Sequence, residues 1–407
     1  MTQPRPQRRA LVIGGSMSGL LAAIMLERRG WAVDVFERVQ GELAGRGAGI
    51  VAQSELIARL DGLGLDTRDL GVAITTRKIL DRSGSITATC ECPQILTAWE
   101  RVYRILRDAF PHERYHRGRG LAGLAQGAHG VVAHLSDGST ASGDVLIGAD
   151  GLRSTVRQQC LPQAVPLYAG YVAWRGLIAE RALPPAIHRE LFHIMAFCLP
   201  RGEQCIGYPV AGPDNDLTPG HRRYNVVWYR PADEANELTR LLTDDSGVTH
   251  AISIPPPLIP RAAIAGMRAA AEGLLPPQMR TIVDLIDEPI LQPIYDLASP
   301  RLAFGRVAII GDAAFVARPH VAAGVSKAAD DAAALAEALD AEDDVAAALA
   351  RFEAERLPQG DKIIERARHL GAYLQANQNA EERSRSVRHG IPEAVLAETA
   401  VLDFLYA

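Results

Sequence analysis

Lysine is scarce in this chain, where it occurs only at Lys78, Lys327 and Lys362, so arginine supplies nearly all of the positive charge. The arginines are interspersed with acidic residues, and the formal net charge is −5. A nucleic-acid-binding protein needs a basic patch or stripe, which this distribution lacks. The composition therefore predicts no nucleic-acid partner.

Cysteine is also infrequent, with five residues in the whole chain. An odd number without repeated CxxC spacing predicts reduced thiols and no disulfide framework. Cys90 and Cys92 are not accompanied by a second pair of potential ligands. We therefore expect no metal site.

Long hydrophobic runs are missing as well. No stretch approaches the roughly 18 uninterrupted apolar residues of a membrane span. The apolar run behind the basic N-terminus is interrupted by GGSMSG, too early for the core of a signal peptide. We therefore expect a cytoplasmic protein with no membrane partner. The 407 residues, 48% of them hydrophobic, favour a globular protein with two interleaved or consecutive domains.

A glycine-rich turn, LVIGGSMSG, follows the first predicted strand at residues 11–19. The segment SGLLAAIMLERRG after it has the pattern of a helix ended by Gly30, and WAVDVFERV is predicted as a second strand. Such a βαβ unit can bring its backbone close to a pyrophosphate, with the helix N-terminus supplying N–H donors. Gly14 and Gly19 fill the first and third glycine positions, and Ser16 stands at the second.

An acidic residue, Glu37, ends the second predicted strand. An acid at this place accepts hydrogen bonds from a ribose diol and argues against a 2′-phosphate on the tightly held nucleotide. This motif alone does not separate NAD from FAD, and a tight turn without a ligand is the alternative. The predicted dinucleotide-binding residues are Gly14, Gly15, Ser16, Met17, Ser18, Gly19, Glu37 and Arg38.

The pattern of strands and helices changes along the chain and returns, which predicts an α/β fold of two interleaved domains. We expect residues 1–75 and 100–165 to begin a Rossmann-like dinucleotide-binding domain. Residues 76–99 and 166–294 are expected to form a mixed β-sheet substrate domain. Residues 295–407 are expected to complete the first domain and to add C-terminal helices that cover it, with a coiled-coil partner interface as the alternative.

Two further segments, GADGLRSTVR at 148–157 and GRVAIIGDAA at 305–314, set an aspartate beside glycine directly after an apolar strand. With the N-terminal glycine turn they resemble the three signatures of the class A flavoprotein aromatic monooxygenases, the para-hydroxybenzoate hydroxylase-like family. The resemblance covers nearly the whole chain. It implies tightly bound FAD, NADH or NADPH as a transient donor, and O2 that forms a flavin hydroperoxide and hydroxylates a small electron-rich ring. It also implies a homodimer.

The resemblance also implies which residues contact FAD. Asp150 would tie together segments around the dinucleotide, and an aspartate at a strand end is otherwise often a helix cap. The family's FAD-contacting arginine, three residues before the leucine of an RxxL helix, is replaced here by Tyr103, for which Arg101 or Arg104 is the candidate substitute. The ribityl chain and the flavin ring would lie along Gly47, Gly49, Ile50, Gly311, Asp312, Ala323, Gly324 and Val325.

Within this family, the runs VIGGSMSGL, GAGIVAQSEL, PHERYH, YAGYVAWRG and GDAAFVARPHVAAG are similar to the hydroxypyridine hydroxylases of microbial nicotine degradation. This likeness implies hydroxylation of 2,6-dihydroxypyridine at carbon 3. The alternatives are an FAD monooxygenase acting on a salicylate- or urate-like compound and a non-hydroxylating FAD oxidoreductase. A flavin-free NAD-dependent dehydrogenase would be colourless when pure.

His320, in RPHVAAG, is the predicted acid/base or substrate-orienting residue, because histidine titrates near neutrality and this segment should line the cavity over the flavin. A histidine that only packs is the alternative. Read with period two, RRYNVVWY places Arg223 and Tyr229 on one strand face. Arg223 is similar to an arginine that holds substrate in urate-type enzymes, or it is solvated at a loop edge. Tyr208 is either a cavity or a core residue.

Trp174 and Arg175, in AWRG, have the pattern of structural residues of the central sheet. We therefore expect no ligand contact from these two residues.

Overall fold

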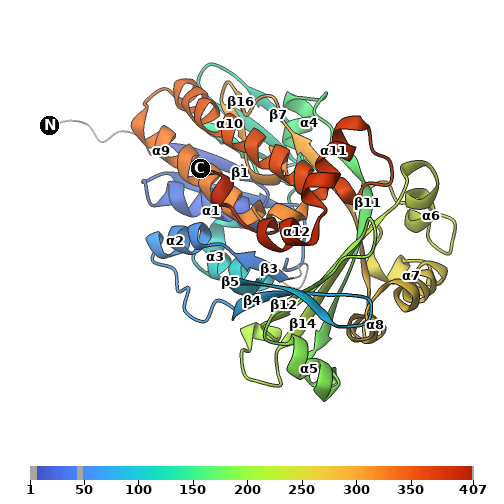
Figure 1. The fold of residues 1–407 in the computed structure, drawn as a ribbon. Helices are drawn as coiled ribbons and strands as arrows, with labels where there is room; N and C mark the ends of the chain where they lie inside the picture. The colour runs from blue at the N-terminus through green and yellow to red at the C-terminus, as the bar shows by residue number, and fades with distance from the viewer. Residues whose placement is uncertain (1–6, 44–48, 406–407) are drawn as a thin grey trace.

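The computed structural model describes residues 7–43 and 49–405 of this chain (Figure 1). The described strands form a six-stranded, a nine-stranded and a three-stranded sheet. No helix in the described part of the chain is long and apolar enough to cross a bilayer.

The six-stranded sheet is built around the N-terminal strand. Its central strands are parallel, and residues 10–13 of the first strand are all buried, as is typical of a parallel strand covered on both faces. The strands lie in the order β16 (Ala303–Phe304), β17 (Val307–Ile309), β10 (Val145–Gly148), β1 (Arg9–Ile13), β2 (Ala32–Glu37) and β6 (Tyr115–Arg117).

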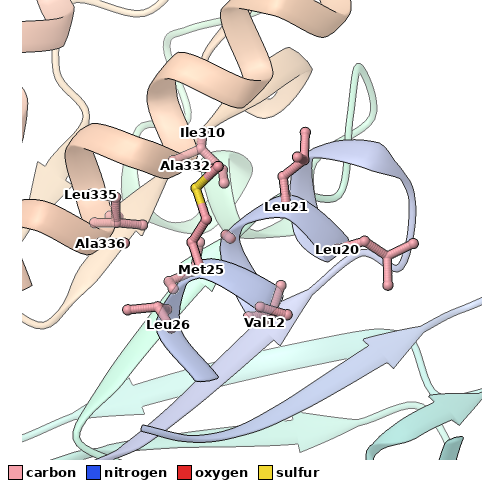
Figure 2. Packing of buried hydrophobic residues seen from close by; sticks show 14 of the residues in the cluster. Val12, Leu20, Leu21, Met25, Leu26, Ile310, Ala332, Leu335 and Ala336 are labelled. Atoms are coloured by element: carbon pink, nitrogen blue, oxygen red, sulfur yellow. The ribbon is translucent and has the colours of Figure 1, made fainter. Parts of the chain in front are cut away.

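The helix α1 (Met17–Glu27) is apolar around most of its circumference because it is covered on two sides. Figure 2 shows Val12 of β1 on one side of it and Leu335 and Ala336 of α9 (Gly324–Ala341) on the other, with Met25 reaching toward α9. The alanines of α9 let the two helices pack closely. This packing holds the glycine-rich turn at the carboxyl end of β1.

The nine-stranded sheet is mostly antiparallel, with one parallel pair between its two halves. The order is β18 (Phe315–Val316), β15 (Ile290–Ala298), β11 (Leu167–Ala179), β14 (Arg223–Pro231), β13 (Gln204–Val210), β12 (Met195–Cys198), β4 (Val72–Leu80), β5 (Ile86–Ala98) and β3 (Gly49–Ala52).

The first two of these strands along the chain, β3 and β4, begin before residue 76, where the sequence placed the start of the second sheet. They join this sheet because both pair with the long strand β5. The division into domains stays a prediction, but the expected boundary falls inside β4.

The two faces of the nine-stranded sheet differ in what covers them. Tyr224, Val226 and Trp228 of β14 pack in the core beneath α5 (Pro185–Leu191), α6 (Thr239–Leu242), α7 (Arg261–Leu274) and α8 (Pro277–Asp284). Val227 and Tyr229 lie on the opposite face. The period-two interpretation of this strand is therefore confirmed, and it leaves one face of the sheet for a cavity.

The remaining elements join or cover these sheets. In Figure 1, α9 and α10 cover the part of the molecule that holds β1, and β11, β12 and β14 extend from it toward α5, α7 and α8. The elements not yet given are α2 (Ser54–Gly62), α3 (Trp99–Asp108), β7 (Leu121–Gln126), β8 (Val131–Leu135), β9 (Thr140–Gly143), α4 (Thr155–Cys160), α10 (Val345–Gly371), α11 (Ala380–His389) and α12 (Pro392–Glu398).

Candidate active site

Two cavities lie near the N-terminus of α1. The first, of about 420 Å³, is called the phosphate-loop cavity and is bordered by Gly14, Ser16, Glu37, Trp99 and Asp150 among others. The second, of about 260 Å³, is called the sheet cavity. It lies between the N-terminal end of α9 and the open face of the nine-stranded sheet, and its lining includes Gly49, Asp312, His320, Val325, Tyr208 and Tyr229.

The glycines of the phosphate loop are required by close backbone contacts. Gly14 has φ +109°, and a Cβ there would collide with the carbonyl oxygen of Ala149. A Cβ on Gly19 would collide with the carbonyl oxygen of Gly14. The first intrahelical bond of α1 runs from Leu20 N–H to the Ser16 carbonyl, so the N–H groups before Leu20 are free of helical partners. These N–H groups and the positive end of the helix dipole suit a phosphate.

Glu37 lies directly beside this loop. Its Oε2 accepts a hydrogen bond from Gly15 N–H at 2.8 Å, and its Oε1 accepts one from Val39 N–H at 2.9 Å. Both Glu37 and the adjacent Arg38 border the phosphate-loop cavity. The acid at the end of β2 therefore borders the cavity that would hold the nucleotide, and its contact with a ribose stays a prediction.

Asp150 caps the N-terminus of α4, as the helix-cap alternative predicts, and it also borders the phosphate-loop cavity. Its carboxylate accepts hydrogen bonds from Ser154 Oγ at 2.5 Å and from Thr155 N–H at 2.6 Å, at the start of α4. Burial raises the pKa of Asp150, and these bonds oppose that shift. Arg157 of α4 then donates to the carbonyl of Ala313 at 2.9 Å, which links this segment to the second aspartate-containing turn.

That second turn, Gly311–Ala313, packs against the first turn of α1. Gly311 has φ +59°, and a Cβ there would collide with Ser18 Oγ. The Asp312 side chain is 56% exposed and opens onto the sheet cavity. The fully buried Lys327 ammonium lies 4.0 Å from Asp312 Oδ1 and favours the ionised form of this carboxylate.

These residues fit FAD. The phosphate loop and Glu37 suit the adenosine diphosphate half of FAD. The turn at Gly311 packs against the start of α1 and connects the phosphate loop with the sheet cavity, which Asp312 borders. There Asp312 can accept from a ribityl hydroxyl. The predicted flavin-lining residues Gly49, Ile50, Ala323, Gly324 and Val325 all border the sheet cavity, whereas Gly47 lies outside the described residues.

Tyr103 does not occupy the place that the sequence interpretation gave it. It is buried inside α3, with its hydroxyl 3.4 Å from that of Tyr115, and Arg104 pairs with Glu100 and Asp214. Arg101 borders a separate surface hollow. Of the α3 residues, Trp99 borders the phosphate-loop cavity.

The sequence interpretation is aligned on Leu106 and does not single out Trp99. Trp99 begins α3 and stands three residues before Val102, so an alignment on Val102 gives it the place of the family's arginine. Its ring stacks on that of Tyr103 with centroids 5.2 Å apart. Trp99 therefore contributes an aromatic ring to this edge of the phosphate-loop cavity.

His320 lies in the sheet cavity but is fully engaged by protein groups. Its Nε2 is 3.0 Å from the Tyr171 hydroxyl, and its Nδ1 is 3.1 Å from Gln204 Oε1. Nδ1–H donates to the Gln204 oxygen, so Nε2 accepts from Tyr171. Burial, with a contribution from Arg318, lowers the pKa of His320 to about 3. The imidazole is therefore neutral at neutral pH, and acting as a base requires it to give up the Tyr171 hydrogen bond.

This pKa gives a pH-dependent contribution to stability. The unfolded histidine takes up a proton below about pH 6.5, whereas the folded one does so only near pH 3, so stability falls with decreasing pH across this window. Between pH 7 and pH 5 the loss is about 2 kcal/mol. We expect His320→Gln to flatten the pH dependence of the unfolding free energy by that amount in urea titrations at the two pH values. Equal slopes for both proteins would contradict a neutral buried imidazole.

Of the two predicted residues of the substrate wall, Tyr229 and Arg223, one lines the sheet cavity. Tyr229 lines the sheet cavity, its ring centroid 4.4 Å from that of His320, and Tyr208 lines it too while donating to the Gly49 carbonyl at 3.0 Å. Arg223 lies outside the cavity lining, because its guanidinium donates to the Ala211 carbonyl at 3.1 Å. Its assignment to substrate stays a prediction. Arg175, expected to be structural, borders the cavity.

The comparisons with known proteins agree with this geometry. A family model described as FAD binding domain-like matches residues 168–296. The chain is 33% identical over 390 residues to the 2,6-dihydroxypyridine 3-monooxygenase of Paenarthrobacter nicotinovorans, covering 95% of this chain and 96% of that protein.

Two solved structures extend this result to the fold. The structure of 2,6-dihydroxypyridine-3-hydroxylase from Arthrobacter nicotinovorans superimposes with a TM-score of 0.86 at 32% identity, covering 92% of this chain and 94% of that one. A Klebsiella pneumoniae HpxO variant complexed with FAD gives a TM-score of 0.76 at 23% identity, covering 97% and 95%. The expected para-hydroxybenzoate hydroxylase-like fold is confirmed. The chain belongs to the FAD-dependent monooxygenases of the aromatic hydroxylase type.

Proposed function

We propose that this enzyme hydroxylates a small electron-rich aromatic N-heterocycle, foremost 2,6-dihydroxypyridine at carbon 3, with NADH or NADPH as electron donor and O2 as co-substrate. The observation that supports this proposal is the sheet cavity, which has a volume of about 260 Å³. The predicted flavin-lining residues line it together with Tyr229, His320 and Arg175. The name of the 33% identical relative supports the choice of ring.

Bound FAD, once reduced, supplies the activation of O2 in this family. The chain's own residues would exclude water and hold the ring. Met195, Ile206 and Val227 give the cavity an apolar wall. The neutral His320, fixed by Tyr171 and Gln204, presents a rigid ring next to Tyr229. In this proposal His320 does not act as a base, because both of its nitrogens are already hydrogen-bonded to protein groups. It orients the substrate through the fixed position of its ring.

The test is a substrate panel of hydroxypyridines, hydroxybenzoates and purines offered to the FAD-loaded enzyme with NADH and with NADPH. We expect 2,6-dihydroxypyridine to stimulate oxidation of the donor and to yield an equivalent amount of product heavier by one oxygen atom. The measurements are donor absorbance and product mass. Turnover of salicylate or urate with an inert dihydroxypyridine would move the proposal to another ring. Donor consumption that yields only hydrogen peroxide would contradict hydroxylation.

A further inference from the structure

Arg175 is a cation of the sheet cavity without a carboxylate partner among residues 7–43 and 49–405. It lies on β11, in register with Val227 of β14 and Ile290 of β15, and its side chain borders both the sheet cavity and a neighbouring hollow that Asp150 also borders. Its Nη1 donates to Gln292 Oε1 at 2.8 Å. Its Nε is buried and has no hydrogen-bond partner in the described part of the chain.

The other charged groups that line this cavity are compensated. Arg318 is paired with Asp296 at 2.8 Å, and Asp312 has the Lys327 ammonium 4.0 Å away. A guanidinium offers five N–H donors in a planar fork that matches a carboxylate or another oxyanion. A partly buried guanidinium with an unused donor is costly unless an acceptor completes it. Arg175 therefore gives the cavity wall a positive group with an unused hydrogen-bond donor.

The charge of Arg175 acts on the wall that faces the substrate. Burial raises the pKa of Tyr229 and of Tyr208, and the guanidinium of Arg175 opposes the rise at both hydroxyls. The guanidinium of Arg175 thus partly offsets the cost of burying a negatively charged oxygen at these two positions. Among the described residues that line the sheet cavity, Asp312 is the one carboxylate, and its ion pair is with Lys327 and not with Arg175.

We propose that Arg175 selects substrates that carry an ionised ring oxygen, by ion-pairing with that oxyanion. The proposal rests on the proposed function for the ring itself. A dihydroxypyridine then binds with one hydroxyl already deprotonated, its proton having gone to solvent. The pairing keeps the anionic, electron-rich form of the ring in place. This removes the need for a protein base and agrees with a His320 whose nitrogens are both occupied.

The experiment is a ligand titration of the FAD-loaded protein, read from the flavin absorption spectrum without any electron donor. The ligands are 2,6-dihydroxypyridine and its non-ionisable analogue 2,6-dimethoxypyridine. We expect Arg175→Gln to raise the Kd of the dihydroxypyridine about 100-fold and to leave the dimethoxy compound unaffected. Arg175→Lys keeps the positive charge but lacks the planar set of guanidinium donors, and we expect it to raise the Kd of the dihydroxypyridine about 10-fold. The matched control is Arg181→Gln, an exposed arginine just after β11, with an unchanged Kd.

The pH dependence supplies a second readout. The affinity of the unaltered protein should follow the ionised fraction of the ligand, and that of Arg175→Gln should not. An unchanged Kd in Arg175→Gln, equal losses for both ligands, or loss of bound FAD would overturn the proposal. Binding is measured without turnover, so a dihydroxypyridine that binds but is not hydroxylated contradicts only the proposed function. The same titration is then repeated with salicylate and with urate as anionic ligands. If Arg175→Gln weakens the binding of none of these anions, the proposed role of Arg175 is overturned.

Discussion

Gly14→Ala should produce a protein that no longer retains FAD. Gly14 combines a φ of +109° with a backbone neighbour, the Ala149 carbonyl, that a Cβ would strike. The loop must therefore move away from β10, and the N–H groups at the start of α1 move with it. We expect the purified variant to be colourless, with an FAD affinity at least 100-fold weaker, measured by flavin fluorescence during titration of the apoprotein.

The matched control for this prediction is Gly30→Ala. Gly30 also has a positive φ, +83°, but a Cβ there meets no atom within 4 Å. It therefore carries the conformational penalty of about 1–2 kcal/mol without the collision. We expect this variant to be yellow and modestly less stable. If both variants lost FAD equally, the effect would come from backbone strain, and the close approach of Gly14 to β10 would not matter.

Asp296→Asn should cause the largest loss of stability. Asp296 is 2% exposed and binds Arg318 Nε at 2.8 Å and Arg368 Nη2 at 2.7 Å. Neutralising the carboxylate leaves the buried Arg318 without a counter-charge, which costs about 3–5 kcal/mol. The measurement is the urea midpoint and slope of the variant against the unaltered protein. Because Arg318 precedes the turn that carries His320, we also expect weaker ligand binding.

Asp66→Asn is the control for this loss. Asp66 also pairs with an arginine, Arg68, at 2.9 Å, but both side chains are exposed. Exposed ion pairs contribute little to stability, so the urea midpoint should not move measurably. Similar losses in the two variants would contradict the assignment of the effect to an unpaired buried charge.

The nucleotide end of the site could be predicted from sequence because its parts are close together along the chain. The strand, the glycine turn, α1 and Glu37 span residues 9–37, and their geometry follows from strand and helix formation alone. The contact of Gly15 N–H with Glu37 confirms that arrangement.

The substrate wall was predicted less completely. The alternation of β14 predicts that Tyr229 faces the cavity, which it lines, whereas it gives no sign that Arg175 of β11 lines the cavity too. For Arg223 the sequence leaves substrate contact and a loop-edge position open, and in the structure its guanidinium donates to a loop carbonyl. Alternation predicts which face a residue occupies within one strand. It does not predict which stretch of that face is left uncovered.

By itself, the sequence of this protein determined the βαβ unit, the flavin signatures and the strand periodicity, because each depends on residues that are near one another in the chain. The tertiary structure decided that His320 is neutral and that Arg175 borders the sheet cavity. Both properties depend on pairing and burial between segments more than a hundred residues apart, such as Tyr171 with His320 and Arg175 with Gln292. Long-range packing alone determines which polar atoms remain without partners, because those partners come from distant parts of the chain.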